Sequence, residues 1–207
     1  MSVKPILFNT EMVRAILDGK KTCTRRIVKG AIPDDAMWGY TMFTPKGCVS
    51  CRGVYADEYG EKFFRLPYQQ GDILYVRETF IQAAAHTFWY KADDNSWMPE
   101  GLHWKPSIHM PKEAVRIWLK VTDVRVERLQ ECGEGWCVDI EKEGIVTPQD
   151  AILYISDDAF HNALRMEFQK NWESTIKKSD LDRYGWDANP WVWVIEFERC
   201  EKPKEEE

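Results

Sequence analysis

Three side chains that follow a glycine have the types needed for hydrolysis: Lys21, Thr24 and Arg26, after Gly19. A threonine hydroxyl becomes a nucleophile when a neighbouring base removes its proton, and a lysine held in its neutral form can be that base. An arginine such as Arg26 would hold a substrate oxygen or stabilise an oxyanion. A simpler interpretation stays open, because basic residues after a helix also complement the negative end of its dipole.

The residues before Gly19 predict a helix over 10–18. Thr10 suits the N-cap, and Glu11 lies favourably in the positive first turn. An apolar stripe marks the buried side of this helix: Met12, Val13, Ile16 and Leu17. Gly19 is then expected to end the helix in a positive-φ conformation.

Residues 22–28 alternate as a strand. One face carries Thr24 and Arg26, and the other carries Cys23, Arg25 and Ile27. A glycine hinge between this strand and the helix would therefore bring Lys21, Thr24 and Arg26 into one small volume.

The pattern Gly19-x-Lys21-x-x-Thr24-x-Arg26 resembles the G-x-K-x-x-(E or T)-x-R signature of ASCH domains, a branch of the PUA-like superfamily. The resemblance continues through GDILYVRE at 71–78 and ends near NPWVWVIEF at 189–197, so it covers most of the chain. It is greatest to the longer ASCH proteins of phages and prophages. The resemblance implies an α+β fold, a curved PUA-like β-barrel with flanking helices and inserted hairpins.

The resemblance also implies a site. Small bacterial ASCH enzymes that deacylate N4-acetylcytidine use a lysine, a threonine and a glutamate, and Lys21 and Thr24 match the first two. Glu143 is the best match for the glutamate, which would orient the lysine or shuttle protons, and Glu141 is its rival because the preceding segment is expanded. This chain departs from those enzymes in its large insertions, which could cover or redirect the cleft.

The end of a strand predicted over residues 73–80 offers further binding candidates, Arg77 and Glu78. Related phage proteins carry the same V-R-E-(T or S) run, which suggests that this strand end borders the pocket. The two residues also suit a rim ion pair of little energetic value.

A rigid loop, WKPSIHMP at 104–111, resembles a recurring segment of the phage-type proteins. Its candidates for binding a base are a stacking face, a cation and hydrogen-bonding groups: Trp104, Lys105, Ser107 and His109. The alternative is that Trp104 and Met110 plug one end of the barrel.

We expect residues 1–200 to form a single domain with insertions at about 29–70 and 83–113, followed by a disordered charged tail at 201–207. Within the first insertion, hairpin strands are expected at 54–55 and 62–65. The remaining elements are strands over 5–9, 117–128 and 191–197, a short helix over 138–143, and a helix over 159–172 that is capped by 156–158 and packs outside the barrel.

The composition limits the partners. A net charge of −6 argues against a protein that coats nucleic acid, although a local basic pocket for one nucleotide remains compatible with it. No apolar run reaches membrane-spanning length and no signal peptide is evident, so a cytoplasmic protein without a membrane partner is expected. The oligomeric state is open.

Cysteine usage does not indicate a disulfide scaffold. The six cysteines are expected to be reduced. Cys48 and Cys51 have zinc-knuckle spacing and could be joined by Cys132 and Cys137, but free thiols are the favoured interpretation. No metal or cofactor is expected.

Two functions from different classes remain. One is amide hydrolysis of N4-acetylcytidine or a related N-acylated base, and the other is non-catalytic binding of RNA or a nucleotide by a protein of phage or prophage origin. A closed cavity for one nucleoside would favour the amidohydrolase, whereas an open groove with a basic rim would favour RNA. An accessory protein acting through its surface is a third possibility.

Overall fold

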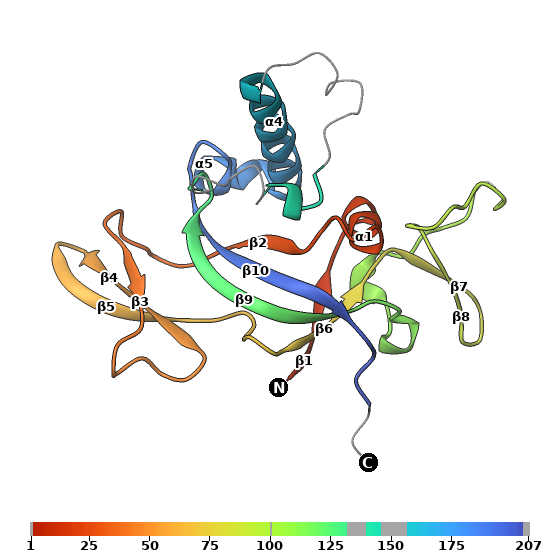
Figure 1. The fold of residues 1–207 in the computed structure, drawn as a ribbon, viewed down its shortest axis with the longest axis horizontal. Helices are drawn as coiled ribbons and strands as arrows, with labels where there is room; N and C mark the ends of the chain where they lie inside the picture. Colours follow the sequence, from red (N-terminus) through yellow and green to blue (C-terminus); the bar gives the residue numbers. More distant parts are fainter. Residues whose placement is uncertain (1, 100, 132–139, 146–156, 205–207) are drawn as a thin grey trace.

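The computed structural model describes residues 2–99, 101–131, 140–145 and 157–204. These residues form a mixed α+β structure that consists mostly of strands with few helices (Figure 1). The central sheet has five strands in the order β1-β6-β9-β10-β2. Their bounds are β1 (Val3–Leu7), β6 (Ile73–Arg77), β9 (Trp118–Arg128), β10 (Trp191–Cys200) and β2 (Cys23–Ile27).

The longest strands form the middle of this sheet. β10 pairs antiparallel with both β9 and β2, whereas β1 pairs parallel with β6. Alternation along β10 places Trp193, Ile195 and Phe197 in the main core, while Val192 and Val194 face a second cluster on the other side. The sheet therefore buries both of its faces.

The prediction of a barrel is wrong in one respect, because the sheet is not closed. β1 and β2 are its edges, and no backbone pairing among the described residues joins them. The helix that connects these strands, α1 (Thr10–Leu17), buries its own apolar face in the main core. The gap is bridged by a side chain, since Arg26 Nη2 donates to the Leu7 carbonyl at 3.0 Å.

The predicted helix and its glycine stop are confirmed, with one correction at the start. Asn9, rather than Thr10, is the N-cap, and its side chain accepts a hydrogen bond from the Met12 amide at 2.9 Å. Thr10 is instead the first helical residue. Gly19 has a φ of +73°, as its position after the last turn requires.

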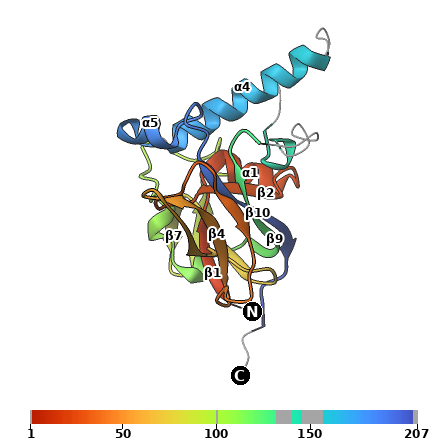
Figure 2. The ribbon, with the colours of Figure 1, turned by 90° about the vertical axis from the view of Figure 1, so that its left-hand side faces the viewer.

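A long helix covers the outer face of the sheet. α4 (Asp157–Thr175) crosses above β2 and β10 in Figure 2, and it begins earlier and ends later than predicted. Leu164, Phe168 and Trp172 pack against Cys23 and the outward side chains of β10. The short helix α5 (Leu181–Tyr184) follows it. Ser156, part of the predicted cap, lies outside the described residues.

The first insertion forms a separate three-stranded sheet, β3 (Met37–Gly39), β4 (Cys48–Tyr55) and β5 (Glu58–Arg65). The expected hairpin is confirmed. Its two turn residues, Ala56 and Asp57, have φ values of 48° and 71°, the conformation that fits a tight two-residue turn to twisted strands.

The cysteine pair of this insertion does not form a knuckle. Cys48 and Cys51 lie three residues apart on the same strand, so their side chains point to opposite faces of β4. Cys132 and Cys137 lie outside the described residues. In the part of the chain that the structure describes, no three His, Cys, Asp or Glu side chains are grouped as metal ligands.

The region expected to be a second insertion, at about 83–113, overlaps a hairpin, β7 (Phe80–Ala84) with β8 (Thr87–Tyr90), and two short 3₁₀ turns. These turns are η1 (Ser107–His109) and η2 (Lys112–Ala114), and a third, η3 (Lys178–Asp180), precedes α5. Of the predicted helix over 138–143, residues 140–142 are helical and 138–139 lie outside the described residues. In the tail, residues 201–204 have no regular structure and 205–207 are outside that range. Among the helices that can be described, none is both long and apolar enough to cross a membrane.

Candidate functional site

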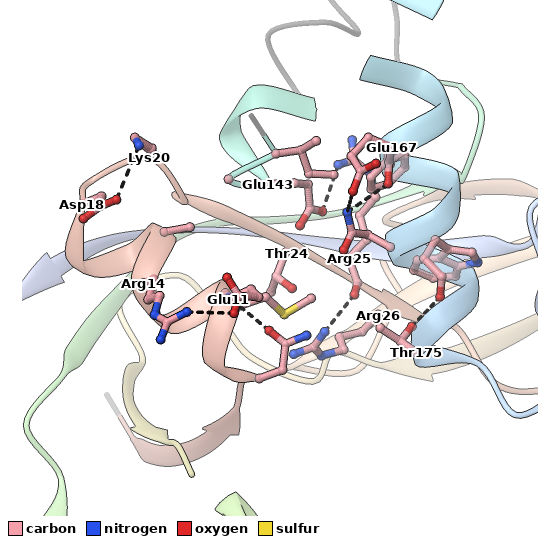
Figure 3. A pocket seen from close by; sticks show the side chains of 18 residues that line it. Glu11, Arg14, Asp18, Lys20, Thr24, Arg25, Arg26, Glu143, Glu167 and Thr175 are labelled. Atoms are coloured by element: carbon pink, nitrogen blue, oxygen red, sulfur yellow. Dashed lines mark hydrogen bonds and ion pairs between the residues drawn. The ribbon is translucent and has the colours of Figure 1, made fainter. Parts of the chain in front are cut away.

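A cleft of about 450 Å³ opens between α1, β2, the segment 143–145 and α4 (Figure 3). β2, the strand of the hinge predicted from the sequence, contributes Thr24 and Arg26 to the lining, whereas Lys21 is not among the lining residues. The lining residues that matter below are Thr24, Arg25 and Arg26 from β2, Glu143, and Glu167 and Asn171 from α4.

The carboxylate of Glu143 is the centre of this site. Lys21 Nζ donates to Glu143 Oε2 at 2.6 Å and to the Glu143 carbonyl at 2.9 Å. Arg25 Nη1 donates to the other carboxylate oxygen at 3.0 Å. The side chains of Lys21 and Glu143 are only 0% and 6% exposed, so two cations and one anion meet out of contact with bulk water.

Main-chain contacts hold Glu143 in this position. The Thr22 amide donates to the Lys142 carbonyl at 2.8 Å, and Lys21 and Glu143 form an isolated antiparallel bridge. Glu141, the rival candidate, is exposed and does not line the cleft. The structure therefore brings Glu143, and not Glu141, to the predicted hinge.

The ion contacts decide the charge of Glu143. Burial would raise the pKa of its carboxyl, but the charges and hydrogen bonds of Lys21 and Arg25 outweigh burial and hold that pKa below its ordinary value. Glu143 is therefore a carboxylate. Both hydrogen bonds of Lys21 Nζ go to Glu143, so Lys21 is engaged in this ion pair and is not free to act on Thr24.

Thr24 presents its side chain to the same cleft. The residue is buried in the sheet opposite Ile195 of β10. Within the described chain, its hydroxyl makes no hydrogen bond to another residue, and Figure 3 shows it near Glu143 with no interaction drawn. The hydroxyl proton is therefore available to a ligand or a base.

Arg26 provides an uncompensated positive charge. Its guanidinium donates to the main-chain carbonyls of Leu7 and Arg25 and lies 5.5 Å from the Phe8 ring centroid. Among the residues that can be described, it forms no ion pair with a carboxylate. The other cations that line the cleft do form such pairs: Arg14 with Glu11, Lys20 with Asp18, and Arg25 with Glu143.

Arg25 was missed by the sequence argument. Alternation correctly placed it on the face of Cys23 and Ile27, where its guanidinium lies 5.5 Å from the Phe168 ring centroid of α4. Its long side chain nevertheless reaches Glu143. An arginine on an otherwise apolar strand face needs a buried partner, and that signal could have identified it.

Cys23 also lies next to the site, but its thiol is a poor nucleophile there. Burial, and then the Glu143 charge, raise the pKa of the Cys23 thiol to about 12. A thiol in this state does not compete with Thr24 as a nucleophile.

The candidates at the end of β6, Arg77 and Glu78, make contacts away from the cleft. Arg77 donates to the carbonyls of Met110, at 3.0 Å, and Ile108. Glu78 is buried and accepts two hydrogen bonds from Arg116, at 2.9 and 3.0 Å. The two residues do not form the suggested ion pair with each other, and neither lines the cleft.

The loop over 104–111 also does not contribute to the cleft lining. Lys105 pairs with the main chain of Phe80, and Met110 is buried in a small cluster with Phe80 and Ala114. The suggested plug of a barrel end does not apply, because the sheet is not closed. The four candidates for base binding, Trp104, Lys105, Ser107 and His109, are half-buried or exposed there and are absent from the cleft.

No family model, curated protein or solved structure matches the chain. The function is therefore argued from the geometry of the cleft.

Proposed function

We propose that the chain is an ASCH-type, PUA-like protein and an amidohydrolase that removes the acyl group from N4-acetylcytidine or a related N-acylated base. One observation carries the proposal. An unpartnered threonine hydroxyl lines a cleft together with a carboxylate that two buried cations keep ionised. A cleft of this volume is within the range of small-molecule sites and suits a single nucleoside.

The residues suit a two-step acyl transfer. Thr24 Oγ1 attacks the acyl carbonyl carbon while the Glu143 carboxylate takes the hydroxyl proton, and the resulting oxyanion faces Arg26. The C–N4 bond then breaks, and Glu143 returns the proton to the leaving nitrogen to give cytidine. Water cleaves the threonine ester in the same way, releasing the carboxylic acid and restoring Thr24.

In this mechanism Glu143 replaces Lys21 as the base. Lys21 is bound to the Glu143 carboxylate at 2.6 Å, so its role is to position Glu143 and to keep it ionised. Arg25 reinforces that role from the other carboxylate oxygen.

The alternative, binding of RNA, has less support at this cleft. A basic groove needs cations whose charge is available to phosphates. Of the cations that line the cleft, only Arg26 lacks an ion pair within the described chain.

The test is direct. Purified protein is incubated with N4-acetylcytidine, and cytidine is followed by chromatography, with the Glu143→Gln variant as the matched control. We expect cytidine from the wild type and a rate at least about a hundredfold lower from the variant, because the glutamine cannot accept the proton. If a folded wild-type protein releases no cytidine from any N4-acylated cytidine, the proposed function is wrong.

A further inference from the structure

The cleft has a wall that the sequence argument did not assign, a polar stripe on α4. Glu167, Asn171 and Thr175 recur at intervals of four, so they lie along one side of the helix, and all three line the cleft. Phe168 and Trp172, beside them, are buried against the sheet and fix the rotation of the helix. The stripe is therefore held toward the cleft by packing.

The described contacts make this stripe a set of hydrogen-bond acceptors. Asn171 Nδ2 donates to the Glu167 carbonyl at 2.9 Å and to Glu167 Oε1 at 3.2 Å. The Asn171 amide is thus oriented with its nitrogen toward Glu167, and in the described chain its Oδ1 has no hydrogen-bond partner. Among the described residues, the second Glu167 oxygen meets only the exposed Lys170, at 3.6 Å, and the Glu167 side chain is itself 40% exposed.

The floor of the cleft has the opposite character. Arg26 has only donors to offer, and the Thr24 hydroxyl carries a donor without an internal partner. A ligand that fills the cleft is therefore expected to present hydrogen-bond acceptors toward β2 and hydrogen-bond donors toward α4.

An N-acylated pyrimidine ribonucleoside has this distribution of groups. The oxygens of the acyl group and of the base accept hydrogen bonds, and the 2′- and 3′-hydroxyls of the ribose donate them. A carboxylate next to an amide oxygen can accept from both hydroxyls of a vicinal diol, and a charged acceptor strengthens each bond.

We infer that Glu167 and Asn171 recognise the ribose diol, so that the site selects free ribonucleosides over 2′-deoxyribonucleosides and over residues within an RNA chain, whose 3′-oxygen is esterified. This inference rests on the proposed function. It assigns α4 as the wall that determines specificity, while the chemistry stays on β2 and Glu143.

The test measures binding of the product, which is not turned over. Dissociation constants for cytidine and 2′-deoxycytidine are measured by calorimetry for the wild type, Glu167→Gln and a control, Glu173→Gln. Glu173 lies on the same helix, pairs with Gln169 and does not line the cleft. We expect the wild type to bind cytidine about tenfold more tightly, because the 2′-hydroxyl donates a charge-assisted hydrogen bond to the half-exposed Glu167 carboxylate that the deoxy compound cannot form.

The two substitutions separate recognition from folding. Glu167→Gln should reduce the preference for cytidine to about twofold or less, whereas Glu173→Gln should keep the wild-type ratio. Equal binding of both nucleosides by a wild type that hydrolyses N4-acetylcytidine overturns this inference alone. A wild type that neither binds cytidine nor hydrolyses its acylated form overturns the proposed function as well.

Discussion

The side chain of Lys21 is shielded from solvent. Its Nζ donates hydrogen bonds to the carboxylate and to the main-chain carbonyl of a single residue, Glu143. Such a cation is stable only while its partner is charged, and Arg25 helps to keep that partner charged. At the scale of the residue, the site is thus one anion between two cations. Its stability and its chemistry depend on the same contacts.

Substituting Lys21 should therefore affect folding as well as turnover. Lys21→Met removes one partner of a buried pair and should lower the free energy of unfolding by about 3 kcal/mol, the lower end of the range because Arg25 remains. Urea denaturation measures this value. The control is Lys20→Met, because Lys20 is 54% exposed in its pair with Asp18 and should contribute less than about 1 kcal/mol. Equal losses for the two variants would contradict the described pair.

The pH dependence of kcat/KM distinguishes the two possible bases. Because the pKa of Glu143 is held below its ordinary value, the carboxylate persists as pH falls and is lost only below the usual range of a glutamate. We expect activity to be constant from about pH 6 to 9 and to fall only in acid. A rate that instead rises about tenfold per pH unit through this range would identify a neutral lysine as the base.

At the scale of elements, the site depends on how closely the segment 143–145 approaches α1. Gly144 has a φ of +79°, and a Cβ there would lie 2.6 Å from Ala15 Cβ and 2.9 Å from Lys21 Cβ. Both neighbouring atoms are Cβ atoms, which cannot move away without a shift of the backbone. The glycine thus lets Glu143 sit between the helix and the hinge.

Gly144→Ala should displace Glu143 and reduce both stability and turnover. We expect a loss of about 2–4 kcal/mol from the positive φ and the crowding together, measured by thermal unfolding. Gly71→Ala is the matched control, since Gly71 has a φ of +86° with no atom within 4 Å of an added Cβ. It should show only the conformational cost, about 1 kcal/mol, and full activity. If both variants lose activity equally, the close approach is not what positions Glu143.

The elements that adjoin one another in sequence at the hinge were the easiest to predict. The helix, the glycine stop and the strand of the hinge follow from local pattern. The N-cap was misassigned by one residue, and the helix and the strand are each slightly shorter than predicted. The contribution of α4 could not be predicted in this way. Glu167 reaches the cleft through the packing of a helix that lies far along the chain from the hinge, and Arg25 of β2 meets Glu143 from a second distant segment. Local periodicity does not determine such contacts.

At the scale of the whole molecule, the mixed strand-rich fold was predicted correctly, whereas the predicted closure of the sheet into a barrel was wrong. Alternation identifies strands and their faces, whereas closure depends on whether β1 pairs with β2. In the described chain these strands do not pair, and the Arg26 side chain of β2 donates to the Leu7 carbonyl of β1 instead. The site residues predicted from the sequence fall into two groups, those at the cleft and those away from it. Of those in the hinge, Thr24 and Arg26 line the cleft and Lys21 binds Glu143 behind it, whereas those at 77–78 and 104–109 make internal contacts or lie elsewhere.

The most direct test of the central claim is the rate of cytidine release from N4-acetylcytidine by the wild type and by Thr24→Val. Valine matches threonine in shape, and this side chain is 1% exposed without an internal hydrogen bond among the described residues, so folding should be preserved. We predict that kcat/KM falls about a thousandfold while the unfolding temperature stays close to that of the wild type. A valine variant that hydrolyses N4-acetylcytidine at the wild-type rate would contradict Thr24 as the nucleophile.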